Sequence, residues 1–117
     1  PEEGRVVYYS SRGPGFGVGP LLISPLSSLT HNSPDGGHRA FSGTSSAAPA
    51  LAGAAAVLIS ALKQEGVKID AASVVQAMKL SGRRLQQEPF IFQGFGLPQI
   101  PEAIAIYKSI IAGDELL

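Results

Sequence analysis

Cysteine and tryptophan are absent from this chain of 117 residues, and charged residues make up only 15% of it. Without cysteine the chain can form no disulfide, no thiolate nucleophile and no Cys-ligated zinc or iron–sulfur site. The nine Lys and Arg residues balance the nine Asp and Glu residues, so no net charge attracts nucleic acid or an anionic lipid surface. We therefore expect no nucleic-acid partner.

A run without charged residues extends from Ala40 to Leu62. A membrane-spanning helix needs about 20 strongly apolar residues. The first third of this run is Ser, Gly, Thr and Pro, and alanine dominates the remainder. We interpret the run as part of a buried helix in a globular fold and expect no membrane span.

The length suits one small domain. The first residues, Pro1-Glu2-Glu3-Gly4, form neither a translation start nor a signal peptide. We expect a processed product whose natural N-terminal part lies elsewhere.

Three segments have the composition of short strands: residues 4–11, residues 21–23 and Phe90-Ile91-Phe92. In addition, Asp35-Gly36 is a dipeptide typical of hairpin turns. It predicts a hairpin whose arms include residues 29–30 and 39–41.

Three helices are expected. The first covers residues 47–62 and ends at Gly66; its alanines predict a central, buried helix, and Gly53 predicts a close backbone contact. The second covers residues 71–81, with Asp70 as its N-cap. The third begins at Pro101 and stops at Gly113.

Strands that alternate with helices indicate an α/β layer architecture with a mostly parallel sheet. Between the second helix and the last strand lie Arg83 and Arg84. We interpret these arginines as part of a solvated connection, with an anion site as the alternative.

The stretch from Phe41 to Gly53 carries the chemistry. A serine between a glycine turn and a small-residue helix lies near unpaired backbone N–H groups and the positive end of the helix dipole. Such groups can stabilise an oxyanion, and Gly43 would let the backbone approach a substrate closely. Taken alone, Gly-Thr-Ser before a helix also fits a simple N-cap.

The longer string Gly43-Thr44-Ser45-Ser46-Ala47-Ala48-Pro49 resembles the active-site serine motif of the subtilisin-like serine peptidases, the subtilases. Two flanking pieces resemble the same family in the expected order. These are Tyr9-Ser10-Ser11-Arg12-Gly13-Pro14 before the motif and Gly94-Phe95-Gly96-Leu97-Pro98-Gln99-Ile100 after it. The resemblance covers roughly Val6 to Tyr107.

The resemblance implies that residues 1–117 are the C-terminal part of a subtilisin-like catalytic domain with a three-layer fold. It implies that Ser45 is the catalytic nucleophile and that its own backbone N–H is one oxyanion donor. Thr44 would lie beside the oxyanion hole and Gly43 along the path of a polypeptide substrate. A serine hydroxyl is a poor nucleophile unless a neighbouring base takes its proton.

In the family, the catalytic Asp and His and the oxyanion Asn all precede the serine by long stretches. Only 44 residues precede Ser45, and none of them matches those positions. The histidines, His31 and His38, and the nearby Asn32 are interpreted as loop or surface residues. We therefore expect the missing N-terminal part of the same domain to be a partner, and we expect the chain alone to be inactive.

Two departures from the family pattern stand out. Ser46 occupies a position where many subtilases have Met, and Leu26 follows Pro25 where a glycine is usual. Residues 61–66 and the long connection before Phe90 resemble the tripeptidyl-peptidase branch. The compartment stays open: the family is mainly secreted, whereas that branch is intracellular.

Two functions remain open: peptide-bond hydrolysis through an acyl-enzyme on Ser45, and a non-catalytic pseudo-peptidase or binding module that keeps the serine loop. No acidic cluster with ligand spacing appears, so we assign no metal site. The resemblance makes calcium an expectation for the full enzyme only. Cutting a sheet exposes apolar faces, so we also expect self-association.

Overall fold

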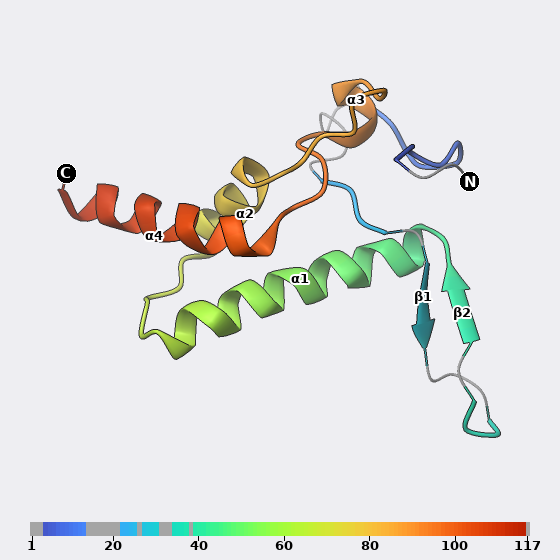
Figure 1. Cartoon of the computed structure of the whole chain (residues 1–117), viewed down its shortest axis with the longest axis horizontal. Helices are drawn as coiled ribbons and strands as arrows, with labels where there is room; N and C mark the ends of the chain where they lie inside the picture. The colour runs from blue at the N-terminus through green and yellow to red at the C-terminus, as the bar shows by residue number, and fades with distance from the viewer. Residues whose placement is uncertain (1–3, 14–21, 26, 31–33, 38, 117) are drawn as a thin grey trace.

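The computed structural model describes residues 4–13, 22–25, 27–30, 34–37 and 39–116. Two short strands precede four helices in this part of the chain (Figure 1). The elements are β1 (Ser27–Thr30), β2 (Arg39–Ser42), α1 (Thr44–Gln64), α2 (Ala71–Leu80), α3 (Phe90–Gln93) and α4 (Ile100–Leu116).

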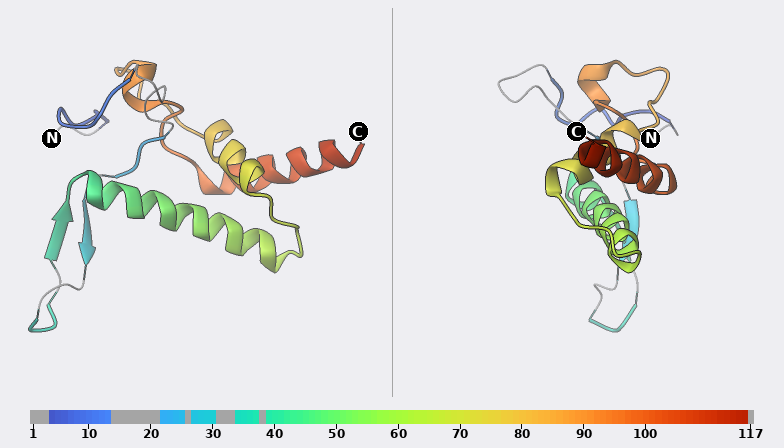
Figure 2. Two further views of the ribbon diagram at one scale, coloured as in Figure 1. Left: turned by 180° about the vertical axis from the view of Figure 1, so that it is seen from behind. Right: turned by 90° about the vertical axis from the view of Figure 1, so that its left-hand side faces the viewer.

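The predicted hairpin is present. β1 and β2 pair in antiparallel register, from Ser27 opposite Ser42 to Thr30 opposite Arg39. At the described part of the turn, an Asp35 carboxylate oxygen accepts a hydrogen bond from the Gly37 N–H at 3.0 Å. The hairpin projects from the N-terminal end of α1, away from the other helices (Figure 2).

α1 begins three residues earlier and ends two residues later than predicted. As expected, Gly66 terminates the helix from just beyond its last residue, with a φ of 75°. The Gly66 N–H donates to the Lys63 carbonyl, and the Val67 N–H donates to the Leu62 carbonyl. These two bonds form a Schellman motif, in which the last carbonyls of the helix are satisfied by the residues beyond it.

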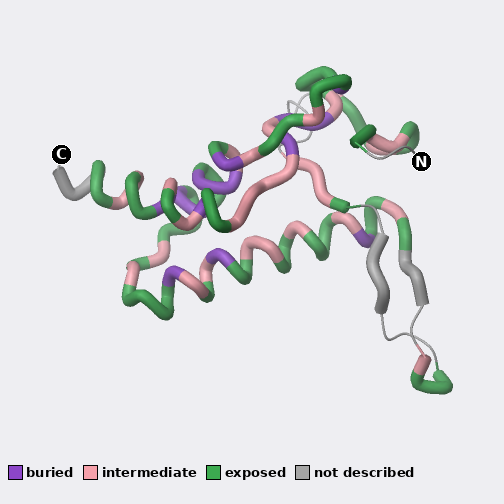
Figure 3. Tube along the Cα trace, viewed as in Figure 1, coloured by how far each residue is buried: buried purple, intermediate pink, exposed green. Residues whose placement is uncertain are grey.

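The prediction that this helix is buried on all sides is wrong for this chain. Only Ser46, Leu58 and Leu62 are buried among its 21 residues, and Val57 is 59% exposed (Figure 3). The predicted backbone contact at Gly53 is also not seen in the described part of the chain, where no atom from outside its own turns of helix lies within 4 Å of where its Cβ would be. Among the described helices, α1 alone is long and apolar enough to cross a membrane by length and composition.

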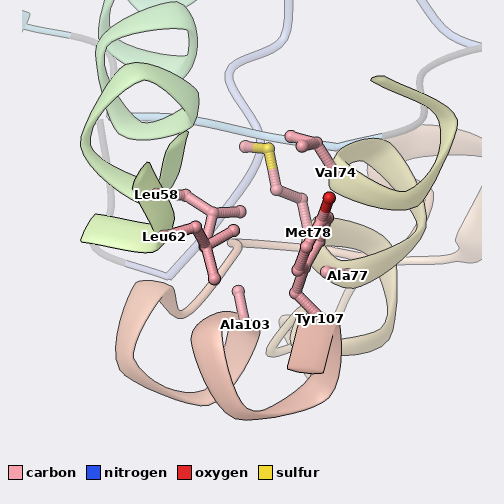
Figure 4. Packing of buried hydrophobic residues seen from close by; sticks show 7 residues of the cluster. All are labelled: Leu58, Leu62, Val74, Ala77, Met78, Ala103 and Tyr107. Carbon is pink, nitrogen blue, oxygen red and sulfur yellow. The ribbon is translucent and has the colours of Figure 1, made fainter. Parts of the chain in front are cut away.

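The hydrophobic core lies where the C-terminal half of α1 meets α2 and α4 (Figure 4). Its buried members are Leu58, Leu62, Val74, Ala77, Met78, Ala103 and Tyr107. The core residues of α2 (Val74, Ala77 and Met78) and of α4 (Ala103 and Tyr107) recur at helical spacing, so each of these helices presents one apolar face to its neighbours. Val75, next to Val74 in α2, is 45% exposed and lies outside this core.

Tyr107 ties the connection between α1 and α2 to α4. Its side chain is fully buried. Its hydroxyl donates to the Lys68 carbonyl at 2.6 Å and accepts from the Asp70 N–H at 2.9 Å. Because a buried polar group without a partner is costly, these bonds fix the path of the chain into α2.

Asp70 caps α2 as predicted. Its carboxylate accepts hydrogen bonds from the Ser73 hydroxyl at 2.7 Å and from the Ser73 N–H at 3.0 Å. Both bonds favour the ionised form, so they hold the pKa of Asp70 below its ordinary value.

At the other end of the core, α4 continues through Gly113 to Leu116, so the predicted stop at Gly113 is wrong. A single glycine costs a helix only about 1 kcal/mol.

The strand predicted at residues 4–11 is absent. Residues 4–13 form turns, with the Ser10 N–H donating to the Val7 carbonyl, and Tyr8 is 85% exposed. Leu22 and Ile23 are likewise not in a strand, and Leu21 lies outside the described residues. β propensity depends on a neighbouring strand, and no neighbour pairs with either segment in the described part of the chain.

Phe90-Ile91-Phe92, predicted as a strand, belongs to the short helix α3. Pro89 precedes the helix with a φ of −73°, and the Phe92 N–H donates to its carbonyl. The Gly94 N–H closes the other end on the Phe90 carbonyl at 2.7 Å. Periodicity cannot separate a strand from a helix in so short an apolar run, and the flanking Pro and Gly decide the outcome.

A buried amide organises the loop before α3. Gln93 is fully buried; its side-chain oxygen accepts from the Leu85 N–H, and its side-chain nitrogen donates to the Leu85 and Glu88 carbonyls. Beyond this loop, Arg83 and Leu97 form an antiparallel bridge. A Cβ on Gly96 would lie 2.3 Å from the Arg83 carbonyl oxygen, so this bridge requires glycine there.

The N-terminal segment is fastened to this loop by Glu88, whose side chain is 4% exposed. The Glu88 carboxylate accepts from the Arg5 guanidinium at 2.7 Å and from the Val6 N–H at 3.0 Å. The first of these bonds is the larger reason that the pKa of Glu88 lies below its ordinary value. The Gly13 N–H adds a further link, to the Ile91 carbonyl at 2.8 Å.

The described part of the chain is therefore mostly helical, and its strands form an antiparallel hairpin. The mostly parallel sheet expected from the sequence is not seen among the described residues. The described parts of the segments that would supply its strands run instead as turns, as irregular chain or as α3.

Replacing Tyr107 by Phe will lower the free energy of unfolding by about 1–3 kcal/mol, because the Asp70 N–H and the Lys68 carbonyl lose their buried partner. Denaturant unfolding followed by circular dichroism measures the change. Tyr9→Phe is the matched control, since Tyr9 is 50% exposed. Equal effects of the two substitutions would contradict the role assigned to the Tyr107 hydroxyl.

Replacing Glu88 by Gln will destabilise the protein at neutral pH, and the difference from the parent will vanish in acid. The folded-state pKa of Glu88 is lowered, so its contribution is present above its unfolded-state pKa and is lost as the pH falls through the folded-state pKa. Unfolding of both proteins at about pH 7 and about pH 3 tests this. A difference that persists undiminished at the lower pH would refute it.

Candidate functional site

Ser45 lies in the first turn of α1, directly after the hairpin. Gly43 is the N-cap, and its carbonyl accepts hydrogen bonds from the N–H groups of Ser46 at 3.0 Å and Ala47 at 3.1 Å. The N–H groups of Thr44 and Ser45 make no bond within the helix, because no helical carbonyl lies far enough before them. The N-cap residue Gly43 makes no side-chain capping bond at this end of the helix. Two backbone donors and the positive end of the helix dipole are therefore left beside the Ser45 hydroxyl.

The three serine and threonine side chains of this turn point in different directions. Thr44 and Ser45 are exposed, whereas Ser46 is only 4% exposed. Successive residues of a helix are rotated by about 100°, so burial of Ser46 turns Ser45 outward. The Ser45 hydroxyl is thus accessible to a reagent or substrate.

Gly43 makes the sharp junction between β2 and α1. Its backbone has a φ of 119° and a ψ of 174°, a conformation that residues with a side chain rarely adopt. This conformation ends the strand and starts the helix within one residue. The structure therefore brings all three predicted site residues, Gly43, Thr44 and Ser45, onto one turn.

A cavity of about 820 Å³ lies beside this turn. Its walls come from residues 4–7 with Ser10, from residues 22–25, from the first two turns of α1, and from Arg83, Leu85 and Leu97. Thr44, Ala47 and Ala48 are the α1 residues nearest the serine that line it. The cavity brings segments from both ends of the sequence next to the helix that carries Ser45.

A proton acceptor for Ser45 is not found in the described part of the chain. His31, Asn32 and His38 lie outside the described residues, so their predicted surface placement stays a prediction. The two carboxylates whose pKa is lowered, Asp70 and Glu88, already accept the hydrogen bonds described above. Neither is bonded to Ser45.

No group of three or more His, Asp or Glu residues that could hold a metal ion occurs within the described ranges. The calcium expectation for the full enzyme stays a prediction.

Pro25 is described but Leu26 is not, so the altered turn predicted there lies outside the described residues.

Sequence reasoning missed the residues that position the walls of the cavity. Gln93 and Glu88 are both buried, and together they hold residues 85–93 against the N-terminal segment. Polar residues are rarely buried without a specific role. In the sequence, the one indication was the position of Gln93 between Phe92 and Gly94. Its hydrogen-bond partners are backbone atoms of Leu85 and Glu88, and composition does not reveal such partners.

Comparison with known proteins places these observations in a family. The sequence matches the subtilase family over residues 1–96, a range that includes the turn with Ser45. It is 34% identical to the membrane-bound transcription factor site-1 protease of Mus musculus over 115 residues, which cover 92% of this chain and 11% of that protein. The corresponding protein of Homo sapiens is 32% identical with the same coverage.

A third relative is pyrolysin from Pyrococcus furiosus, which is 29% identical over 117 residues covering 91% of this chain and 8% of pyrolysin. The chain thus spans about a tenth of the length of the curated relatives that it matches. No solved structure matches. The match over residues 1–96 shows that this chain belongs to the subtilase family of serine peptidases.

Proposed function

We propose that this chain carries the nucleophile of a serine peptidase, and that Ser45 attacks the carbonyl carbon of a peptide bond. The observation that supports this best is the exposed hydroxyl of Ser45 on the first turn of α1, inside the region that matches the family. Family membership supplies the reaction class, and the geometry supplies the candidate atom.

The reaction follows from the chemistry of the turn. The Ser45 oxygen forms a bond to the carbonyl carbon while a base takes its proton, and the carbonyl oxygen becomes an oxyanion. The backbone N–H of Ser45, unpaired at the helix start, is placed to donate to that oxyanion. Collapse of the intermediate breaks the C–N bond and expels the amine, which takes the proton from the protonated base. Water, losing a proton to the same base, then attacks the acyl-enzyme, and the acid is released as the Ser45 hydroxyl regains its proton.

We further propose that the base and its carboxylate partner come from a segment of the catalytic domain outside these 117 residues. This follows the family order, in which both precede the serine at a distance. Thr44 would then border the oxyanion site, and Gly43 would lie along the bound polypeptide. The alternative is a non-catalytic relative that keeps the serine turn, and the labelling experiment below separates the two.

In the protein with its complete catalytic domain, a fluorophosphonate probe will modify Ser45, as peptide mapping by mass spectrometry will show. Ser45→Ala will abolish labelling and reduce kcat by roughly 10⁶-fold, the loss that follows removal of a triad serine. Ser60→Ala is the matched control, since Ser60 is an exposed serine of the same helix. Absence of label on Ser45 in the complete domain would favour the non-catalytic alternative.

Replacing Gly43 by Ala will reduce kcat/KM by about 10²-fold. The alanine side chain is strained at the positive φ of this position, and the backbone change that relieves this strain shifts the first turn and misplaces the serine. The same substitution will lower the free energy of unfolding by about 1–3 kcal/mol. Gly53→Ala is the control on the same helix, where the added methyl group meets no atom within 4 Å. It will leave kcat/KM unchanged and stabilise the helix by up to about 1 kcal/mol. Similar kinetic losses in both variants would show that Gly43 has no special role.

A further inference from the structure

Four side chains from α2, α3 and the loops beside them form a continuous row, in which two adjacent aromatic rings lie between two cations. This cation–aromatic row consists of Lys79, Phe95, Phe90 and Arg84. The Lys79 ammonium lies 4.9 Å from the centre of the Phe95 ring. The Phe95 and Phe90 rings meet edge to face at 5.4 Å, and the Arg84 guanidinium lies 5.4 Å from the Phe90 ring.

The cations of the row have no carboxylate partner in the described part of the chain. Between residues 71 and 99 the sequence has three cations and one carboxylate, Glu88. That carboxylate is occupied by Arg5 and the Val6 N–H. Arg84 and Phe90 are exposed, Phe90 by 41%, so the row presents both charge and apolar surface to solvent.

The neighbouring arginine belongs to the other side of this segment. Arg83 pairs with Leu97 in the antiparallel bridge and lines the cavity beside α1. Adjacent residues of an extended segment point to opposite faces. Arg83 and Arg84 therefore serve different surfaces, although they are adjacent in sequence.

We propose that the cation–aromatic row is a docking site for an extended acidic peptide with an apolar residue between two carboxylates. The two cations are at most about 16 Å apart along the row. In an extended chain, residues four positions apart lie about 13 Å apart and point to the same side, as does the residue midway between them. Two acidic residues would thus reach the cations while the middle residue contacts the Phe90 and Phe95 rings.

The size of the row favours a peptide over the other polyanions. Salt-dependent nucleic-acid binding of the kind made by proteins with about 6–10 phosphate contacts needs several cations, and polybasic membrane sites use about 4–8 Lys and Arg residues. The row has two cations, and the whole chain has no net charge. Guanidinium pairs with carboxylates in a planar, two-bond geometry, and the rings add apolar contact that neither a phosphate backbone nor a headgroup would use.

The test is fluorescence anisotropy with a labelled peptide that contains Glu-Ala-Leu-Ala-Glu between glycines. It is carried out on the Ser45→Ala protein, so that proteolysis cannot consume the probe and the result does not depend on the proposed catalytic role. Binding is expected for this peptide and not for its glutamine counterpart. Arg84→Gln and Lys79→Gln will each weaken binding about tenfold, the loss expected for one charge-assisted hydrogen bond.

Arg83→Gln is the matched control and will leave the affinity unchanged. Phe90→Leu, which keeps an apolar side chain, will weaken binding less than Arg84→Gln, and thermal melting will show that each variant is folded. Equal binding of the glutamine peptide, or equal losses for the two arginine variants, would overturn the proposal. Preferential binding of duplex DNA or of vesicles containing anionic lipid in the same assay would overturn it as well.

Discussion

The packing of Leu58 and Leu62 against α2 and α4 fixes the direction of α1, and the position of Ser45 depends on it. Ser45 and Leu58 lie on the same helix about 20 Å apart, at 1.5 Å per residue. The core lies at the C-terminal half of α1, while the serine lies at its other end beside the hairpin (Figure 1). The core thus determines where the Ser45 hydroxyl lies through the length of α1, without direct contact between Ser45 and the core residues.

The features that the sequence predicted well are those set by local chemistry. The Asp70 cap, the end of α1 at Gly66 and the hairpin around Asp35-Gly36 each depend on residues within a few positions of one another. The serine turn belongs to the same class, because Gly43 at a positive φ forces the chain from strand to helix. Family resemblance predicts a role for Ser45, which local chemistry alone left open.

The features that the sequence predicted poorly depend on distant partners. Residues 4–11 and 90–92 have strand composition, yet the first forms turns and the second forms α3. Strand formation needs a neighbour, and a neighbour is not encoded in the segment itself. The burial of Gln93 and Glu88 also depends on partners far along the chain, such as Arg5. The parallel sheet was predicted from the strand-like composition of residues 4–11 and 90–92, and it is not seen among the described residues because neither segment forms a strand.

Much of the apolar surface of α1 remains open to solvent. The accessible surface is 7744 Å², against about 6,000 Å² for a compact monomer of this mass. The radius of gyration is 16.1 Å, whereas a compact domain of about 100 residues has one near 13 Å. The prediction that the chain associates, with itself or with the remainder of its catalytic domain, rests on this surface.

The Arg5–Glu88 ion pair also constrains how the protein emerges during synthesis, since 83 positions separate the two residues. At about 5–20 residues per second, a ribosome needs roughly 4–17 s to make the chain between them. Throughout that interval the first residues have no docking site, although α1 can already form. The bonds from Arg5 and Val6 to Glu88 therefore form only after Glu88 has left the exit tunnel.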